Sequence, residues 1–336
     1  MPQLPELVQA LLNPNAYPET PPQGIELVQT QMSFVFLTDD YVYKVKKPVN
    51  LGYLDYTTLD KRHFYCQREV ELNRRLCPDA YLGVVPISQD KGNISIDGQG
   101  EIIEYAVKMR RLPQEAMMDR LLANNKVSPQ MVTSVAHKLA EFHQQAETNT
   151  TISGFGDLDA ITRNTEENFT QTKKYIGNTI SQAQYQIIKD YTTTFIKNNT
   201  SLFRKRMNDG RIRDCQGDLH AAHICFTDDI CIYDCIEFSD RFRYCDVASE
   251  VAFLAMDLDH YGRADLSRGF VNAYVARSRD NDLLRLLNFY KCYLAYVRGK
   301  VESFKLDDPY ISEEEKTGVL AAARSYFELA ESYVEI

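Results

Sequence analysis

The sequence has few glycines and prolines, and it contains no long apolar run. Its 336 residues include 15 Gly and 12 Pro, a share that excludes collagen-like and low-complexity chains. No stretch approaches the roughly 18 consecutive apolar residues of a membrane-spanning helix. Residues 1–6 also lack the positive charge that opens a signal peptide. We therefore predict a cytoplasmic protein with no membrane partner.

Positive charge is also scarce. The chain has 38 Lys and Arg against 47 Asp and Glu, for a formal net charge of −9 at pH 7. An acidic chain lacks the positive field that holds a nucleic-acid backbone, so we predict no nucleic-acid partner. The basic stretch Lys44-Val45-Lys46-Lys47 stands out in this acidic chain and could serve one bound anion. The composition indicates no particular oligomeric state.

The eight cysteines include no C-x-x-C pair, and reduced thiols are the expectation for a chain of this length. Five of the cysteines and two histidines fall within about thirty residues, which raises the possibility of a zinc site. Their spacing matches no standard finger or ribbon. We instead predict that Cys225 and Cys231 are small buried residues. The crowded residues are Cys215, His220, His223, Cys225, Cys231, Cys235 and Cys245.

Hydrophobic periodicity divides the chain into a β-rich part and a helical part. A short helical pattern at 5–12 lies within a Pro- and Asn-rich segment that reads as a surface lead-in. Alternating apolar residues then predict strands at 25–28, 34–37, 41–45, 82–87, 94–96 and 102–107. Asp97-Gly98 is typical of a hairpin turn between the last two strands. Helical spacing predicts helices at 57–76, 117–122, 131–145, 181–205, 267–299 and 312–333. Residues 146–170 are polar and read as loop.

The densest group of chemically active residues is Gly217-Asp218-Leu219-His220, followed by a short apolar hairpin and Ile236-Glu237-Phe238-Ser239-Asp240. This pattern resembles the catalytic loop and metal-binding segment of the aminoglycoside phosphotransferase family, which are small-molecule relatives of the protein kinases. The resemblance extends over most of residues 25–275. Within the family it is similar to an uncharacterised bacterial branch.

The resemblance implies an α+β, two-lobed, protein-kinase-like fold. Residues 1–24 would form the lead-in, 25–108 a small β-rich N-lobe that binds nucleotide, and 109–336 a larger helical C-lobe with the catalytic loop and the acceptor site. Some relatives carry an additional nucleotide-kinase domain. Because no G-x-x-x-x-G-K-[ST] sequence occurs here, we expect this chain to act without one.

The resemblance also implies the nucleotide site. Lys44 would hold the phosphates, and Glu69 on the following helix would pair with it. Residues 29–33 replace the usual glycine-rich loop, with Ser33 as a phosphate contact, and Met109 lies in the hinge at 104–112 that would bind adenine. Lys46 projects from the same strand face as Lys44, and proximity alone would allow either lysine. A solvated strand lysine is the alternative for Lys44.

Phosphoryl transfer requires a carboxylate that orients the acceptor and carboxylates that hold Mg²⁺. The pattern assigns the first role to Asp218, for which a helix-capping aspartate is the alternative. It assigns the metal to Glu237, Asp240 and His223. Two of these residues depart from the family pattern. Glu237 stands where the family usually has aspartate, and His223 stands where kinases have a metal-binding asparagine.

We therefore expect a phosphotransferase that uses ATP and Mg²⁺ to phosphorylate a hydroxyl group of a small molecule. The alternative is a nucleotide-binding pseudokinase or regulatory module without efficient turnover, which His223 favours because Mg²⁺ prefers oxygen ligands. A protein kinase is disfavoured, since the sequence contains neither Asp-Phe-Gly nor Ala-Pro-Glu.

Overall fold

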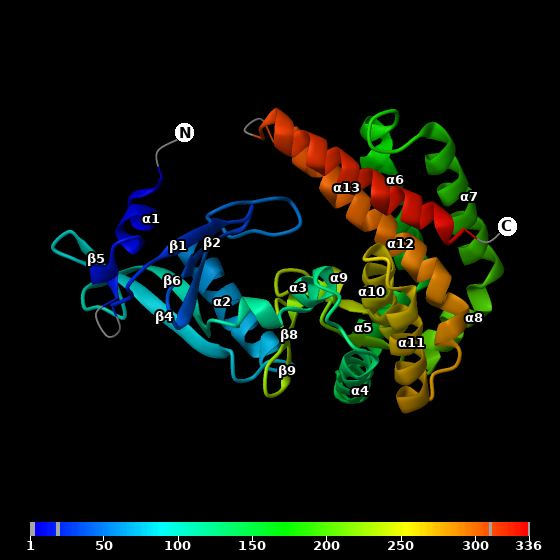
Figure 1. The fold of residues 1–336 in the computed structure, drawn as a ribbon, viewed down its shortest axis with the longest axis horizontal. Coiled ribbons are helices and arrows are strands. Elements are labelled where there is room, and N and C mark those ends of the chain that lie inside the picture. The colour runs from blue at the N-terminus through cyan, green and yellow to red at the C-terminus, as the bar shows by residue number, and fades with distance from the viewer. Residues whose placement is uncertain (1–3, 18–20, 309–310, 335–336) are drawn as a thin grey trace. The chain divides into compact units, whose positions relative to one another are not determined.

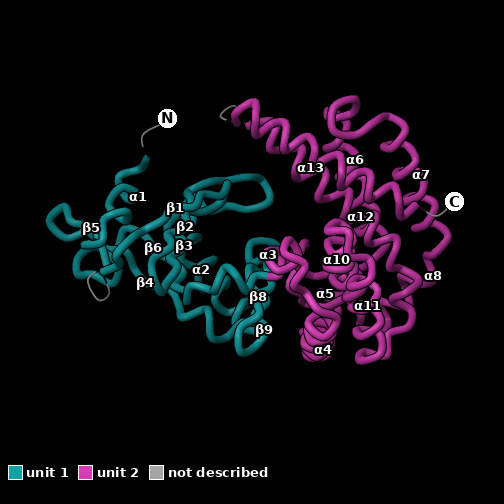
Figure 2. The backbone as a smooth tube through the Cα atoms, viewed as in Figure 1, with its two compact units in different colours: residues 1–117, 223–240 teal, residues 118–222, 241–336 magenta. Residues whose placement is uncertain are grey.

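The computed structural model describes residues 4–17, 21–308 and 311–334. Residues 1–3 and 18–20 of the expected lead-in, and 309–310 and 335–336 of the expected C-lobe, lie outside the described residues. The chain forms two compact units, shown in Figure 2: unit 1 comprises Met1–Met117 and His223–Asp240, and unit 2 comprises Met118–Ala222 and Arg241–Ile336.

The first compact unit extends beyond the boundary expected at residue 108. Unit 1 continues to Met117 and also takes in a hairpin that the sequence assigned to the helical lobe. That hairpin bonds to unit 1, because Cys225 forms a β-bridge with Met117 and the Ile232 N–H donates to the Leu76 carbonyl oxygen at 3.4 Å. Backbone pairing across more than 100 residues of sequence is invisible to local periodicity.

Unit 1 is built on a six-stranded antiparallel sheet in the order β1-β2-β3-β6-β4-β5 (Figure 1). Its strands are β1 (Glu26–Gln29), β2 (Ser33–Leu37), β3 (Tyr41–Lys46), β4 (Tyr81–Asp90), β5 (Asn93–Ile96) and β6 (Glu101–Arg110). Unit 1 also contains α1 (Glu6–Leu11), η1 (Pro14–Ala16), α2 (Leu59–Asn73), η2 (Gln114–Ala116) and the hairpin of β8 (Ile224–Phe226) and β9 (Ile230–Ile232).

Alternation along the central strands gives the sheet two buried faces. On one face Tyr43, Val45 and Ala106 pack in a core with residues of α1. On the other face Val107 packs with Val70 of α2. The side chains of Lys44 and Lys46 therefore lie on the α2 face, which decides the surroundings of both lysines.

The N-terminal segment is not a surface lead-in. Val8 and Leu11 of α1 are buried against the sheet, and the Tyr17 ring lies 5.2 Å from that of Tyr43. The Tyr17 hydroxyl donates to the Leu11 carbonyl oxygen at 2.8 Å. The segment carries few apolar residues, but they share one core cluster with residues of the sheet, so its described part belongs to the core of unit 1.

The predicted strands are present, but one predicted pairing is wrong. β4 pairs with both β5 and β6, so β5 and β6 are not neighbours. The tight turn joins β4 to β5 at Lys91-Gly92, where both residues have positive φ. Asp97 also has positive φ, which explains its turn signal, but the chain there crosses β4 rather than folding back on β5.

The helix predicted at 57–76 is present as α2, and Thr58 caps it by accepting the Lys61 N–H. Beyond its end, a disulfide joins Cys77 to Cys231 in β9, with the two Cα atoms 4.6 Å apart. Cys225 and Cys231 are buried as predicted. The expectation of reduced thiols is wrong for Cys77 and Cys231, whose proximity arises from a contact 154 residues apart in sequence.

Unit 2 is helical. Its helices are α3 (Met118–Ala123), α4 (Pro129–Gln145), α5 (Thr150–Ser153), α6 (Leu158–Thr172), α7 (Gln182–Asn198), α8 (Thr200–Asn208), α10 (Val247–His260), α11 (Ala264–Ser278), α12 (Leu283–Phe304) and α13 (Glu313–Ser332), and α9 (Asp240–Arg243) begins at the last residue of unit 1. Short elements are η3 (Gly154–Gly156), η4 (Lys173–Tyr175), η5 (Ala221–His223), η6 (Lys305–Asp307) and the paired strands β7 (Ile212–Asp214) and β10 (Tyr244–Asp246). No described helix is long and apolar enough to cross a membrane.

The long helix α6 of unit 2 was not predicted from the sequence. α6 lies where the polar composition predicted loop, and its first turn is capped by Asp157, which accepts the Ala160 N–H at 2.7 Å. Its buried face consists largely of polar residues at helical spacing, namely Thr165, Asn168 and Thr172 with Phe169. Polar side chains fill much of this buried face, so the polar composition of the segment concealed a helix that also buries Ala160 and Phe169.

We expect the Cys77–Cys231 bridge to contribute to stability, since removing a native disulfide typically costs roughly 2–5 kcal/mol. A reductant should lower the Tm of the wild-type protein but not that of Cys77→Ala. The matched control is Cys225→Ala, a buried thiol of the same unit, which should keep the reductant sensitivity. Thermal denaturation with and without dithiothreitol checks this. Alkylation of all eight cysteines without prior reduction would contradict the bridge.

Candidate functional site

Lys44 lies between two carboxylates of unit 1. Its Nζ is 2.9 Å from Glu69 Oε1 on α2 and donates to Asp234 Oδ1 at 2.8 Å. The pairing with Glu69 that the resemblance implies is therefore present in the structure. Asp234 comes two residues after β9, and the sequence did not single it out. The site of Lys44 thus combines β3, α2 and the segment after β9.

Lys46 occupies a second, fully buried position on the same face. Its Nζ donates to Glu69 Oε2 at 2.6 Å and to Glu237 Oε1 at 2.5 Å. The Tyr56 hydroxyl donates to the same Glu237 oxygen at 2.6 Å. The side chain of Lys46 is only 1% exposed, against 17% for Lys44. Glu69 is therefore shared, one oxygen to each lysine.

The neighbouring charges in this cluster shift the pKa values of Glu69 and Lys44. Burial by itself would raise the pKa of Glu69, but Lys44 and Lys46 outweigh it and lower that pKa. Burial would also lower the pKa of Lys44, but Asp234 and Glu69 raise it well above its usual value. Both groups are therefore charged at neutral pH. Three carboxylates face two ammonium groups, which leaves an excess of negative charge suited to a cation.

The backbone around Asp234 is held in an unusual conformation. Asp234 has φ of 58°, in the left-handed region that aspartate tolerates better than most residues. Its N–H donates to the Tyr81 hydroxyl at 3.3 Å, and the next N–H, of Cys235, donates to Asn73 Oδ1 at 2.8 Å. These contacts to β4 and the end of α2 fix the direction of the Asp234 carboxylate.

His223 and Asp240 occupy different environments. His223 Nε2 lies 3.6 Å from Asp234 Oδ2, so the imidazole faces a carboxylate that also contacts Lys44. Asp240 is exposed at the start of α9. Glu237, the third residue expected to bind metal, is buried and bonded to Lys46 and Tyr56. His223 thus faces Asp234, the carboxylate that also contacts Lys44.

The two remaining nucleotide candidates lie on strands of the sheet. Ser33 begins β2 and is buried, and its N–H donates to Thr30 Oγ1 at 3.0 Å, so the turn itself uses this amide. Met109 on β6 pairs in register with Val42 and Tyr81. It packs with the core on the α2 face, the face that also carries Lys44, and offers an apolar wall there.

Asp218 lies in unit 2, on a loop that α10 holds by its backbone. The Gln216 and Gly217 N–H groups donate to Glu250 Oε1 at 2.7 and 2.6 Å. The Ala221 N–H donates to Asp257 Oδ2 at 2.8 Å. The Asp218 side chain is 32% exposed. The carboxylates of Glu250 and Asp257, both on α10, thus fix the loop before and after Asp218. The Asp218 side chain itself reaches solvent.

His220 is the titratable neighbour of Asp218 within unit 2. Its Nε2 lies 3.6 Å from Asp218 Oδ2. Burial alone would lower the pKa of His220, but Asp218 raises it above its usual value. Asp246, four residues before Glu250, caps α10 by accepting the Ala248 N–H and pairs with Arg206.

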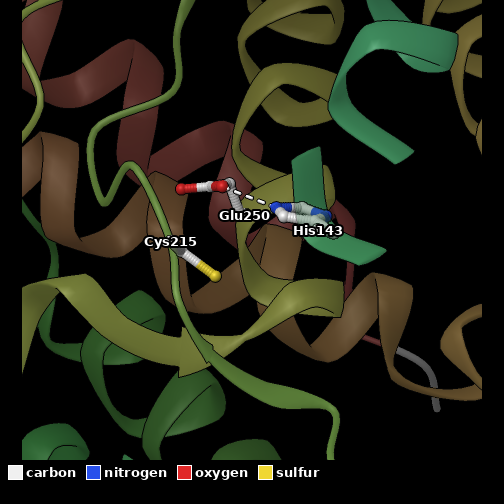
Figure 3. Close-up of side chains that lie close together, drawn as sticks. All are labelled: His143, Cys215 and Glu250. Atoms are coloured by element: carbon white, nitrogen blue, oxygen red, sulfur yellow. Dashed lines mark hydrogen bonds and ion pairs between the residues drawn. The ribbon is translucent and has the colours of Figure 1, made fainter. Parts of the chain in front are cut away.

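Glu250 is itself held by a buried cluster, drawn in Figure 3. Its Oε2 lies 2.7 Å from His143 Nε2, and His143 Nδ1 lies 2.7 Å from the Tyr274 hydroxyl. Burial would lower the pKa of His143, but hydrogen bonds with Cys215 and Glu250 raise it to about 9. The ligand atoms of His143, Cys215 and Glu250 lie within 4.8 Å of one another. Both ring nitrogens are already bonded, so we interpret the cluster as a brace for the loop rather than a metal centre.

Comparison with known protein sequences finds uncharacterised relatives of this chain. No family model matches the sequence. The uncharacterised protein Rv2004c of Mycobacterium tuberculosis is 34% identical over 289 residues, which cover 86% of this chain and 56% of that protein. The uncharacterised protein Mb2027c of Mycobacterium bovis matches to the same extent. The chain thus spans little more than half the length of these relatives.

Solved structures decide the fold. A spectinomycin phosphotransferase, in complex with ADP and spectinomycin, matches 99% of this chain and 99% of its own, with a TM-score of 0.54 at 10% identity. The chain has the aminoglycoside phosphotransferase fold. An amicoumacin kinase in complex with AMP-PNP and Ca²⁺ covers 92% of this chain and 88% of its own, with a TM-score of 0.53 at 12% identity. An ethanolamine kinase of Plasmodium vivax covers 90% and 81%, with a TM-score of 0.50 at 13% identity.

The expected α+β, protein-kinase-like fold is therefore confirmed. Within the aminoglycoside phosphotransferase fold, neither Asp234 nor Tyr56 was predicted as a site residue from the sequence. Lys46 was predicted only as an alternative to Lys44. Asp234 had one usable signal: it follows the apolar strand 230–232 directly. The family resemblance instead implied Glu237, three residues further along, as the metal ligand. Tyr56 had no signal, because it lies in a polar connection and meets Glu237 only in three dimensions.

The His143–Glu250 pair predicts a pH dependence. The pKa of His143 is 6.5 for the unfolded chain and about 9 in the folded protein. Folding therefore favours the protonated ring, so the stabilisation is complete below pH 6.5 and is lost as pH rises through 9. We expect the free energy of unfolding to fall by roughly 2–3 kcal/mol more in the wild type than in His143→Gln over this interval.

Urea denaturation at pH 6.5 and 9 measures this difference. His137→Gln is the matched control, since His137 lies exposed on the same helix, and it should behave like the wild type. The same pH dependence in wild type and His143→Gln would contradict a charged His143.

Proposed function

We propose that the protein is a phosphotransferase that moves the γ-phosphoryl group of ATP to a hydroxyl group of a small molecule, with Mg²⁺. The observation that carries this proposal is the position of Lys44 Nζ, held between Glu69 and Asp234 at 2.9 and 2.8 Å. A partly exposed lysine fixed by carboxylates from a helix and from the segment after a strand is suited to hold nucleotide phosphates. The kinases and phosphotransferases of similar fold support the same reaction class.

Asp234 is the better candidate for a metal ligand than Glu237. The Glu237 oxygen Oε1 accepts hydrogen bonds from Lys46 and Tyr56 inside the unit. The Asp234 side chain is 39% exposed, and its Oδ2 faces His223. Carboxylate oxygens suit a hard cation. A bound Mg²⁺ would neutralise charge that develops on the phosphates, and Asp234 with His223 would hold it. The geometry gives Asp240 no support in this role.

Asp218 is the proposed catalytic residue for the acceptor. As a carboxylate near a substrate hydroxyl it would orient that group and accept its proton. Glu250 and Asp257 fix the backbone on either side, so the carboxylate is positioned before substrate binds. Such preorganisation lowers the cost of reaching the transition state.

His223 supports the pseudokinase as a second candidate, because an imidazole is a poorer ligand for Mg²⁺ than an amide oxygen. The two candidates differ in turnover. An active enzyme should tolerate His223→Asn or gain from it. A pseudokinase should show negligible turnover in the wild type, with any gain confined to His223→Asn.

Mg-ATP binding tests the Lys44 assignment. Saturation at about 100 times Kd should stabilise the wild type by roughly 2.7 kcal/mol, and Lys44→Met should lose most of this effect. Lys108→Met is the matched control, since Lys108 lies on the same sheet with its Nζ 4.8 Å from the ring centroid of Tyr41, away from Glu69. Thermal denaturation with and without Mg-ATP measures it. A wild type unaffected by millimolar Mg-ATP would contradict the proposed function.

Turnover tests Asp218. We expect Asp218→Asn to keep the Mg-ATP stabilisation and to lower kcat by several orders of magnitude. The reason is that the Asp218 carboxylate accepts the proton of the acceptor hydroxyl only in the transition state, so its loss affects turnover and not nucleotide binding. ATP consumption measured with sugars, amino alcohols, aminoglycosides and nucleosides supplies the assay. Asp209→Asn, an exposed aspartate of the same unit, is the control and should be fully active. Equal activity of Asp218→Asn and wild type would rule out this mechanism.

A further inference from the structure

The second lysine of the cluster has no place in the reaction described above. Lys46 is 1% exposed, and its ammonium group is enclosed by Glu69 Oε2, by Glu237 Oε1 and by the ring of Tyr56, whose centroid is 4.9 Å away. To contact a phosphate it would have to leave both carboxylates. Lys46 therefore acts through its neighbours and not on the nucleotide.

A buried ion pair is seldom the most stable way to fill a core, because two charges lose their hydration. Apolar residues could occupy this position, so the pair needs another explanation. The contacts of Lys46 indicate one. Its two carboxylate partners are Glu69, which also contacts Lys44, and Glu237, which lies three residues after Asp234 on the same segment.

We propose that Lys46 is a positioning residue that retains Glu237 in the interior and thereby leaves Asp234 as the carboxylate available to the metal. This inference rests on the proposed function. Tyr56 assists by donating to the same Glu237 oxygen. Glu69 pairs with both lysines and so connects their roles. Lys44 is available to the phosphates, and Lys46 neutralises Glu237.

The loss of Lys46 should release Glu237. In Lys46→Met the Glu237 carboxylate lacks its cationic partner, and a divalent cation is the natural replacement. We expect Mn²⁺, a paramagnetic substitute for Mg²⁺ with the same preference for oxygen ligands, to bind more tightly in the absence of nucleotide. Changes to groups that support a metal ligand alter affinity about 10–100-fold, so we expect at least a tenfold decrease in Kd.

Removing both charges should reverse this effect. In Lys46→Met/Glu237→Gln, residue 237 carries no carboxylate that could leave the interior. The Kd for Mn²⁺ should therefore return to within about threefold of the wild-type value, which is smaller than the 10–100-fold change expected when a group that supports a metal ligand is altered. The double variant also avoids an unpaired buried charge. It remains informative even where Lys46→Met fails to fold. Lys108→Met, which alters a lysine of the same sheet away from the cluster, should bind Mn²⁺ like the wild type.

Electron paramagnetic resonance of unbound Mn²⁺, titrated with the full chain in the presence and absence of ATP, measures these affinities. Tighter binding by Lys46→Met together with restoration in the double variant supports the inference. Unchanged binding by Lys46→Met overturns it, and so does a double variant that differs from the wild type by tenfold or more. A wild type that binds neither Mn²⁺ nor Mn²⁺ with ATP overturns the proposed function and this inference with it.

Discussion

Glu69 accepts two ammonium groups, one on each carboxylate oxygen, and unit 1 is arranged around this shared charge. Burying Lys44 and Lys46 on one sheet face is unfavourable unless carboxylates meet them there. α2 brings Glu69 to that face, and the segment after β9 brings Asp234 and Glu237. The sheet, the helix and the returning segment must therefore all be in place before either lysine is stable.

Unit 2 uses the same principle for a different purpose. Glu250 is a buried carboxylate on a helix, and it receives two backbone N–H groups of the Asp218 loop as well as the His143 ring. Here the carboxylate positions backbone rather than ammonium groups. In both units the residues proposed to act on substrate are held by buried carboxylates on helices, which limits their movement more than loop residues could.

Much of the fold was predictable because it follows from local patterns. Alternating apolar residues indicated the strands of the sheet, and the helical spacing of apolar residues over 57–76 indicated α2. The errors share a cause. α6 buries Thr165, Asn168 and Thr172 beside Ala160 and Phe169, so its composition is polar. β4 lies between β5 and β6 through pairing that local turn signals do not reveal. Local sequence reports propensity, whereas strand order depends on contacts between distant segments.

The sequence by itself determined which types of residue form the candidate site and on which side of a strand the two lysines lie. The two-residue spacing of Lys44 and Lys46 places both on one side of β3, and Gly217-Asp218-Leu219-His220 identifies the loop of the catalytic candidate. Tertiary structure decided the partners. Lys44 donates a hydrogen bond to Asp234, 190 residues later in the sequence, and Lys46 donates one to Glu237, 191 residues later. Spacing along a strand fixes the direction of a side chain, but which carboxylate reaches it depends on how distant segments pack.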